Sequence, residues 1–413
     1  MTTPDLTPLI EKDLPEWVAL RHTLHAHPEL AFAEFATAER VREHLSQLEG
    51  LSIREGVGGT GVVAVLGREK PGPAVALRAD MDALPMEETT GLPYASTVPG
   101  KMHACGHDGH TTALLAAARV LHQIRDTLEH PVVFLFQPAE EGGAGAARML
   151  EDGGLADPRP AAIFGLHNMP LPTLRLGQIA WREGALMAAA GKFTITVRGR
   201  GGHAAIPHLN IDPIPIAAQI VTGLQQILSR QTNPLVPTVL SVTEIHAGSA
   251  FNVIPENATL RGTFRCLDQI EFASLPDKIT RICEQIAAAF HAECRVVFDE
   301  EPYPVLVNDR RACHVLREVC TETGRGEDTF DICPPLMASE DFAFYTHQIP
   351  GAFFFVGTRP PEVPEVPMCH HPAFDFNDDA LPHCIALHCE IARRFPRLWQ
   401  AAEPGSNQSA LTE

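Results

Sequence analysis

Short apolar runs recur along the first part of this sequence, and polar residues follow each run closely. Four of these runs span residues 62–66, 74–77, 132–136 and 161–166, and segments with helical spacing lie between some of them. Short buried strands that alternate with helices are typical of an α/β fold with a largely parallel sheet. In open sheets of this kind, ligands bind beyond the carboxyl ends of the strands. We therefore expect the functional site where these strands end.

Side chains that can bind metals or transfer protons stand at the ends of the predicted strands. They are Asp80 and Asp82 after the second run, Glu140 and Glu141 after the third, His167 after the fourth, and His370 and His371 after a further strand at 353–357. Each of them alone has a simpler interpretation, such as a helix cap or a buried histidine. Their recurrence at one edge of a single sheet favours a common site.

The segment MHACGHDGH at 102–110 adds a thiol and more imidazoles directly before a predicted helix at 111–124. Cys105 and His107 are one residue apart, and a thiolate with a neutral imidazole suits zinc or another borderline divalent metal. The sequence then offers five metal donors, namely Cys105, His107, Glu141, His167 and either His370 or His371.

Five donors are too many for one tetrahedral zinc ion and too few to close two separate sites. Two divalent ions that share a ligand and a water molecule fit this number. Donor chemistry alone does not choose among zinc, manganese, nickel and cobalt. The surplus carboxylate, Glu140, is then free to accept a proton and pass it on, and Asp82 would orient a ligating imidazole.

The sequence pattern changes near residue 191. Between 188 and 301 the predicted elements follow the order β-α-β-β-α-β, a ferredoxin-like layout of suitable size for one small domain. The α/β character resumes after residue 302. We therefore predict an α/β fold in which a mixed-sheet catalytic domain, residues 1–187 and 302–400, contains an inserted α+β ferredoxin-like domain, residues 188–301. Residues 401–413 are expected to form a disordered tail.

Composition excludes several kinds of partner and location. The net charge of −19 disfavours nucleic acid and anionic membranes as partners. No apolar run of about 18 residues is present, so no transmembrane helix is expected. The N-terminus lacks the basic and apolar regions of a signal peptide, and the ten cysteines are scattered. We therefore expect a reduced, cytoplasmic protein.

Eight segments carry longer motifs. They are RADMDALP at 78–85, MHACGHDGH at 102–110, QPAEEGGAGA at 137–146, GLHN at 165–168, GRGGHAAIPH at 199–208, FNVIPENATLRGTFR at 251–265, SEDFAFY at 339–345 and CHHPAFDFND at 369–378. Together they resemble the M20 metallopeptidase family over about residues 15–397. The closest branch is the amidohydrolases of N-acyl amino acids, such as hippurate hydrolase and the auxin-conjugate hydrolases.

This resemblance implies a metal-binding role for five positions. Cys105 resembles the bridging ligand, where other branches have Asp. His107, Glu141 and His167 match the terminal ligands. The family's last ligand lies in a Leu-His-x-Pro frame, which aligns His370 before His371-Pro372, with Cys369 in place of the usual Leu.

The resemblance also implies catalytic and substrate-binding roles. Glu140 matches the general base and Asp82 the carboxylate that orients the site. His203 resembles a lid histidine that steadies the scissile carbonyl oxygen, often from the partner subunit. Asn252 and Arg265 resemble lid residues that grip the substrate carboxylate, a task that suits an Arg fork. A homodimer or higher oligomer through the lid is implied as well.

The expected activity is hydrolysis of the amide bond of N-acyl amino acids, of the hippurate or N-acetyl type, to a carboxylic acid and a free amino acid. One alternative is a dipeptidase or carboxypeptidase on the same machinery. A more remote alternative is a non-catalytic, metal-dependent binding protein. The binding protein is disfavoured because it has no need of Glu140, Asp82 and His203.

Overall fold

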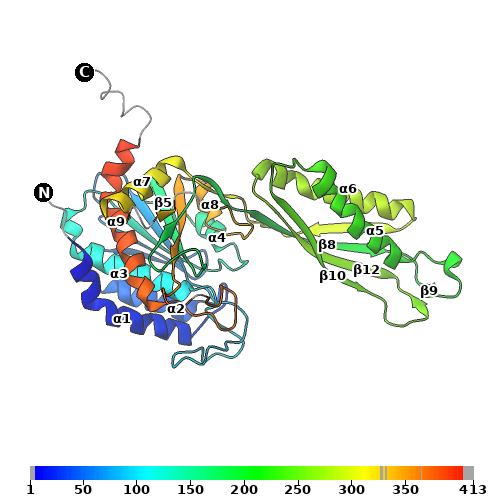
Figure 1. Ribbon diagram of the computed structural model, residues 1–413, viewed down its shortest axis with the longest axis horizontal. Coiled ribbons are helices and arrows are strands. Elements are labelled where there is room, and N and C mark those ends of the chain that lie inside the picture. The colour runs from blue at the N-terminus through cyan, green and yellow to red at the C-terminus, as the bar shows by residue number, and fades with distance from the viewer. Residues whose placement is uncertain (1–4, 326–328, 331–332, 364, 403–413) are drawn as a thin grey trace, which may run out of the picture. The chain divides into compact units, whose positions relative to one another are not determined.

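The computed structural model describes residues 5–325, 329–330, 333–363 and 365–402. The chain divides into two compact units (Figure 1). Within the described residues, the first unit consists of the chain up to Gly184, Val307–Pro334 and the chain from Asp341 onward. The second unit consists of Ala185–Leu306 and Pro335–Glu340. The second unit extends a few residues beyond the expected 188–301 at each end. It also includes residues 335–340, which the sequence pattern did not assign to it.

The first unit is built on a mixed sheet. Within the described residues this sheet has eight strands, in the order β1-β2-β4-β3-β5-β16-β6-β15. The neighbours β4, β3, β5 and β16 are parallel, whereas β2 pairs antiparallel with both β1 and β4. The strand bounds are β1 Ser52–Val57, β2 Gly61–Leu66, β3 Val75–Asp80, β4 Val132–Gln137, β5 Ala162–Met169, β6 Ile179–Ala180, β15 Thr329–Phe330 and β16 Gly351–Gly357. The expected α/β fold with a mixed sheet is confirmed, and the four apolar runs form β2 to β5.

The helices of the first unit pack against one another and against this sheet. Helix α3 contacts α1 and α9, α9 contacts α7, and α4 contacts α8. Buried alanines such as Ala113 and Ala117 allow close packing around α3. The bounds are α1 Thr7–Ala26, α2 Phe35–Ser46, α3 His107–Gln123, α4 Gly145–Glu151, α7 Arg310–Glu322, α8 Ala343–Thr346 and α9 Leu381–Ala401. Helix α3 begins earlier than the predicted 111–124, so the last residues of MHACGHDGH form its first turn. Of the expected tail, residues 403–413 lie outside the described residues.

Two buried histidines of this core predict how its stability depends on pH. His130 and His388 are almost fully buried, and the ring nitrogens of His388 have no hydrogen-bond partner among the described residues. Burial lowers the pKa of His130 to about 4 and that of His388 to about 3. In the unfolded chain, both imidazoles become protonated near a pH of about 6.5. Below that pH the unfolded state binds more protons than the folded state, so stability falls as pH falls.

The replacement His388→Leu tests this pH dependence. Between pH 7.5 and 5.0 the buried imidazole should cost about 2 kcal/mol of unfolding free energy, and the leucine variant should not show that loss. Urea unfolding at pH 7.5 and 5.0 measures the difference. At pH 7.5 the imidazole is neutral in both the folded and the unfolded state. The difference in unfolding free energy between the variant and the wild type at this pH therefore measures the change in packing alone. Equal pH dependence in the variant and the wild type would contradict the prediction.

The second unit has the expected ferredoxin-like order. Its four-stranded sheet, β10-β12-β8-β13, is antiparallel throughout, and α5 and α6 pack on it. The bounds are β8 Ala189–Arg198, α5 Pro213–Gln226, β10 Thr238–Ala247, β12 Asn257–Cys266, α6 Gln269–Ala289 and β13 Glu293–Phe298. Buried and more exposed side chains alternate along β8, because only one face of the sheet is covered by helices. A short ribbon pairs β9, Gly202–His203, with β11, Val253–Ile254.

Two more short strands, β7 Gly184–Met187 and β14 Leu306–Asn308, lie where the chain passes from one unit to the other. None of the helices in the described part of the chain combines the length and the apolar character that a membrane crossing requires.

Candidate active site

The polar residues predicted at the strand ends converge in the first unit. Asp80 ends β3 and Asp82 follows it, Glu140 and Glu141 follow β4, and His167 lies within the last residues of β5. These three strands are parallel neighbours, so their carboxyl ends lie at one edge of the sheet. The candidate residues therefore lie together at the edge of the sheet where the strand pattern placed them.

Two groups of potential metal donors meet at Cys105. In the first group, donor atoms of Cys105, His107 and His167 all lie within 4.8 Å of one another. In the second, the same holds for Cys105, Glu141 and His370. Cys105 Sγ lies 3.3 Å from His167 Nε2, and His370 Nε2 lies 3.0 Å from Glu141 Oε1. The structure thus brings all five candidate donors together, and both groups share Cys105.

The neighbouring His371 is not part of either group. Its Nδ1 instead accepts a hydrogen bond of 3.0 Å from the N–H of Ala373. Of the two histidines that the sequence offered as the last donor, His370 is the one beside Glu141.

Backbone conformation allows these loops to converge. Gly106 precedes α3 with a φ of 88°, and a Cβ at this position would lie 2.1 Å from Asn168 Oδ1. Glycine is therefore required between the first two donors of the motif. His370 has a φ of 68°, and its N–H donates to Ala104 O at 2.7 Å. This bond ties the His370 loop to the segment that carries Cys105.

The donor atoms fit divalent cations. His107 Nε2 is buried and has no hydrogen-bond partner among the described residues, while its Nδ1 lies 2.9 Å from Asp82 O and 3.3 Å from Asp82 Oδ1. His167 Nδ1 lies 2.7 Å from Asn168 O, and its Nε2 faces Cys105. Metal-binding imidazoles usually have this arrangement, with one ring nitrogen donating to oxygen and the other left for the metal.

The charges around these donors also favour cations. Burial lowers the pKa of His107, but nearby carboxylates, Asp80 first, more than offset this effect and raise it to about 10. A hydrogen bond with Cys369, burial and nearby glutamates raise the pKa of the Cys105 thiol. Both donors would keep their protons at neutral pH unless a cation replaced them. The residues present therefore fit a site for divalent metals.

Asp82 and Glu140 lie beside the donors. Both are buried. Besides its contact with His107, Asp82 accepts a hydrogen bond of 2.9 Å from the N–H of Glu141, so it contacts two of the donor residues. Glu140 forms a further group within 4.8 Å with His107 and Glu141, and its Oε1 accepts from the N–H of Asp341 at 3.3 Å. A carboxylate in this place can exchange protons with a molecule held at the donors.

A buried ionic network beside the donors was not predicted from the sequence. Asp80 pairs with Arg78 at 2.7 Å and lies 2.6 Å from His110 Nδ1. Arg78 also pairs with Asp341 at 3.1 Å. The one available signal was that these residues belong to the motifs at 78–85, 102–110 and 339–345, of which the first two contain residues with assigned roles.

The predicted lid residues lie at two separate places in the second unit. His203 pairs with Val253 in the β9–β11 ribbon, and Asn252 O accepts from the N–H of Ala204 at 3.1 Å, so His203 and Asn252 are neighbours. Both are exposed. Arg265 lies near the far end of β12, where its Nη1 donates to Met337 O at 3.0 Å. The length of β12 separates the two places by roughly 25 Å. This separation is much larger than one carboxylate group, so within one chain Asn252 and Arg265 do not bind the same carboxylate.

Comparison with known proteins gives a consistent result. Residues 76–394 match the sequence pattern of Peptidase family M20/M25/M40. The chain is 40% identical over 388 residues to IAA-amino acid hydrolase ILR1-like 5 of Arabidopsis thaliana, covering 93% of this chain and 88% of that protein. It is 41% identical over 385 residues to N-acetyl-L-cysteine deacetylase of Bacillus subtilis, with the same two shares.

Two further similarities bear on activity and metal content. Thermostable carboxypeptidase 2 of Saccharolobus solfataricus is 37% identical over 388 residues, covering 93% of this chain and 96% of that protein. The crystal structure of a dinuclear metal-binding peptidase from Bacillus subtilis is similar with a TM-score of 0.78 and 36% identity, covering 94% of this chain and 99% of that one.

Proposed function

This chain belongs to peptidase family M20/M25/M40, and from that premise we propose that it hydrolyses the amide bond of N-acyl amino acids to a carboxylic acid and a free amino acid. The observation that carries the proposal is the pair of donor groups joined at Cys105 with the carboxylate of Glu140 beside them. Relatives named for IAA-amino acids and N-acetylcysteine support this substrate class.

In this proposal Cys105, His107, Glu141, His167 and His370 hold two divalent ions, which are zinc, manganese, nickel or cobalt. When bound, such ions polarise the amide carbonyl and make a water molecule readily lose its proton. Glu140 accepts that proton on a carboxylate oxygen and delivers it to the leaving nitrogen. Asp82 keeps the His107 ring oriented through its contact with Nδ1.

The lid residues contribute substrate contacts in this proposal. His203 stabilises the negative charge that develops on the carbonyl oxygen, and Asn252 and Arg265 bind the substrate carboxylate. The separation of His203 and Asn252 from Arg265 along β12 supports a site to which two subunits contribute. We therefore propose a homodimer or higher oligomer.

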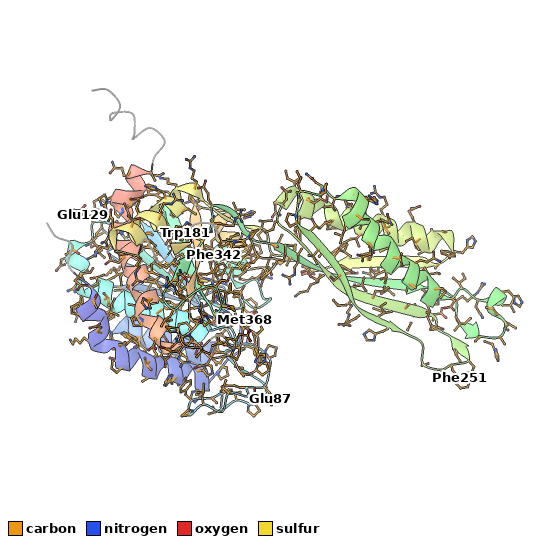
Figure 2. All side chains as sticks on the ribbon, viewed as in Figure 1. Glu87, Glu129, Trp181, Phe251, Phe342 and Met368 are labelled. Carbon is orange, nitrogen blue, oxygen red and sulfur yellow. The ribbon has the colours of Figure 1, made fainter. Side chains whose placement is uncertain are left out.

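The second unit offers a surface for such an assembly. Strand β10 lies at an edge of its sheet, where backbone groups are available to pair with another chain. Ile245 on this strand is exposed. Phe251 beyond the strand is exposed as well (Figure 2). A monomeric mass in light scattering would contradict the oligomer and the division of the site between subunits.

The cellular location is also proposed. All ten cysteines are free in the structure, and eight of the ten lie in or against the apolar cores. Free thiols in this number suit a reducing compartment, and we propose the cytoplasm.

A substrate panel tests the proposed function against its rivals. Hippurate, N-acetyl amino acids, indole-acetyl amino acids and dipeptides are assayed side by side with the metal-loaded protein. We expect the highest kcat/KM on the acyl amino acids. Preference for dipeptides would favour the dipeptidase or carboxypeptidase alternative, and a metal-loaded protein inert on every substrate would favour the binding protein.

A further inference from the structure

Another carboxylate outside the donor set contacts the loop that carries Glu140. Glu34 precedes α2 and is fully buried. Its Oε1 accepts hydrogen bonds from the N–H groups of Phe32 at 3.1 Å and Ala139 at 2.9 Å, and its Oε2 accepts from the Thr60 hydroxyl at 2.5 Å. A carboxylate buried among uncharged donors loses its hydration and is retained where those hydrogen bonds matter.

The bond to Ala139 bears directly on the proposed catalytic group. Ala139 is the residue before Glu140 and has a φ of 54°, a left-handed conformation that a residue with a Cβ adopts only when its surroundings hold it. The turn continues with a bond from the N–H of Gly142 to Glu140 O at 2.7 Å. The direction of the Glu140 side chain therefore depends on the conformation at Ala139.

Two buried carboxylates hold this loop on either side of Glu140. Glu34 accepts from the N–H of Ala139, the residue before it, and Asp82 accepts from the N–H of Glu141, the residue after it, both at 2.9 Å. Asp82 has an assigned partner in His107, whereas Glu34 touches none of the five donors. Its hydrogen bond to Ala139 reaches the loop, and its hydrogen bonds with Phe32 and Thr60 hold the carboxylate in place.

We propose that Glu34 is a positioning residue for Glu140, which it holds in its proton-transfer orientation through the amide of Ala139. This inference rests on the proposed function, because it assumes that Glu140 carries the proton. Glu34 acts because its side chain is long enough for Oε1 to accept hydrogen bonds from the N–H groups of both Phe32 and Ala139. It belongs to none of the groups of potential metal donors among the described residues.

The chemistry of the side chain suggests a matched pair of variants. In Glu34→Gln the amide oxygen can take the place of Oε1 and accept from both N–H groups, while the amide nitrogen donates to the Thr60 hydroxyl, which rotates to accept. In Glu34→Asp the charge remains, but the side chain is shorter by one methylene and falls short of Ala139. The two variants thus separate the effect of side-chain length from the effect of side-chain charge.

The control is a second carboxylate of the same segment. Glu29 accepts from the N–H groups of Ala36 at 3.1 Å and Thr37 at 2.8 Å at the start of α2, and it makes no side-chain bond to the Glu140 loop. Glu29→Ala should therefore destabilise α2 without changing the conformation at Ala139.

The experiment compares kcat, KM, metal content and hydrogen exchange of residues 138–146 in these variants. Glu34→Asp and Glu34→Ala should lower kcat by about 10- to 100-fold with KM and metal content unchanged, and should speed exchange in the loop. Glu34→Gln and Glu29→Ala should keep kcat within a few-fold of the wild type.

Three results would overturn the inference. They are wild-type kcat in Glu34→Asp, an equal loss of kcat in Glu29→Ala, or a loss in Glu34→Gln as large as that in Glu34→Asp. If Glu34→Ala does not fold, the Asp and Gln variants still decide. A wild type inert on the substrate panel would instead reject the proposed function, while the exchange rates would still test whether Glu34 holds the loop.

Discussion

Glu140→Gln should lower kcat by a factor on the order of 10² to 10⁴, the contribution typical of general acid–base catalysis. Gln has the shape of Glu but accepts no proton at neutral pH, so the step that activates water and protonates the leaving nitrogen is lost. The N–H of Asp341 can still donate to the amide oxygen, so the side chain should keep its place. Metal content and KM should therefore remain close to those of the wild type.

The adjacent carboxylate provides the contrast for this experiment. Glu141→Gln removes a donor that lies 3.0 Å from His370 Nε2, so this variant should lose metal together with activity. Elemental analysis and steady-state kinetics on the two variants separate the roles of neighbouring glutamates. Near-normal turnover in Glu140→Gln would reject the proposed mechanism, and metal loss in that variant would make Glu140 a ligand.

Removal of divalent metal should abolish turnover and lower stability, and this is the second large effect that we expect. Dialysis against a chelator followed by addition of zinc, manganese, nickel or cobalt, one at a time, measures recovery and identifies the effective ion. A ligand that binds only the folded state stabilises it by about 2.7 kcal/mol at 100 times its Kd. Full activity in protein shown by elemental analysis to be metal-free would contradict the proposal.

Variants of Cys105 test the same dependence on metal at one donor atom, the Cys105 sulfur. Because Cys105 belongs to both donor groups, Cys105→Ala should lower the affinity for both metal ions. Cys105→Asp should retain part of the activity, since a carboxylate can also bridge two ions. Cys389→Ala is a suitable control, because Cys389 is fully buried on α9 and belongs to neither group. Two ions bound with wild-type affinity in Cys105→Ala would show that the thiol is not shared.

Much of the fold could be predicted because the apolar pattern is local. The runs at 62–66, 74–77, 132–136 and 161–166 have the length and bounds of strands, and the β-α-β-β-α-β order survives any error in individual boundaries. The start of α3 was missed because His107 and Asp108 look like loop residues, whereas Gly106 at a φ of 88° begins the helix before them. After Val307–Pro334 in the first unit, the chain goes back to the second unit at residues 335–340, and no local sequence pattern indicates this.

The candidate donors were also found from local signals, namely their residue types and their places after strands. Apart from Asp82, the residues that hold the donors were not found, because they are distant in sequence from the residues they contact. Glu34 and Ala139 are separated by 105 positions, and Asp341 and Gln137 by 204. In a sequence, a buried carboxylate looks the same as a solvated one. The three-dimensional contacts are needed to tell them apart.

The position of Asp341 has a consequence for the order in which the protein can acquire its structure during synthesis. Its carboxylate accepts from Gln137 and from the N–H of Ala146 at 2.9 Å, so it completes the surroundings of the Glu140 loop. A ribosome makes the whole inserted unit before it reaches this residue, and a nascent chain that ends before it leaves those donors unpaired. The insertion can therefore fold first, and the interrupted unit around it reaches its final form only when the C-terminal part of the chain has been made.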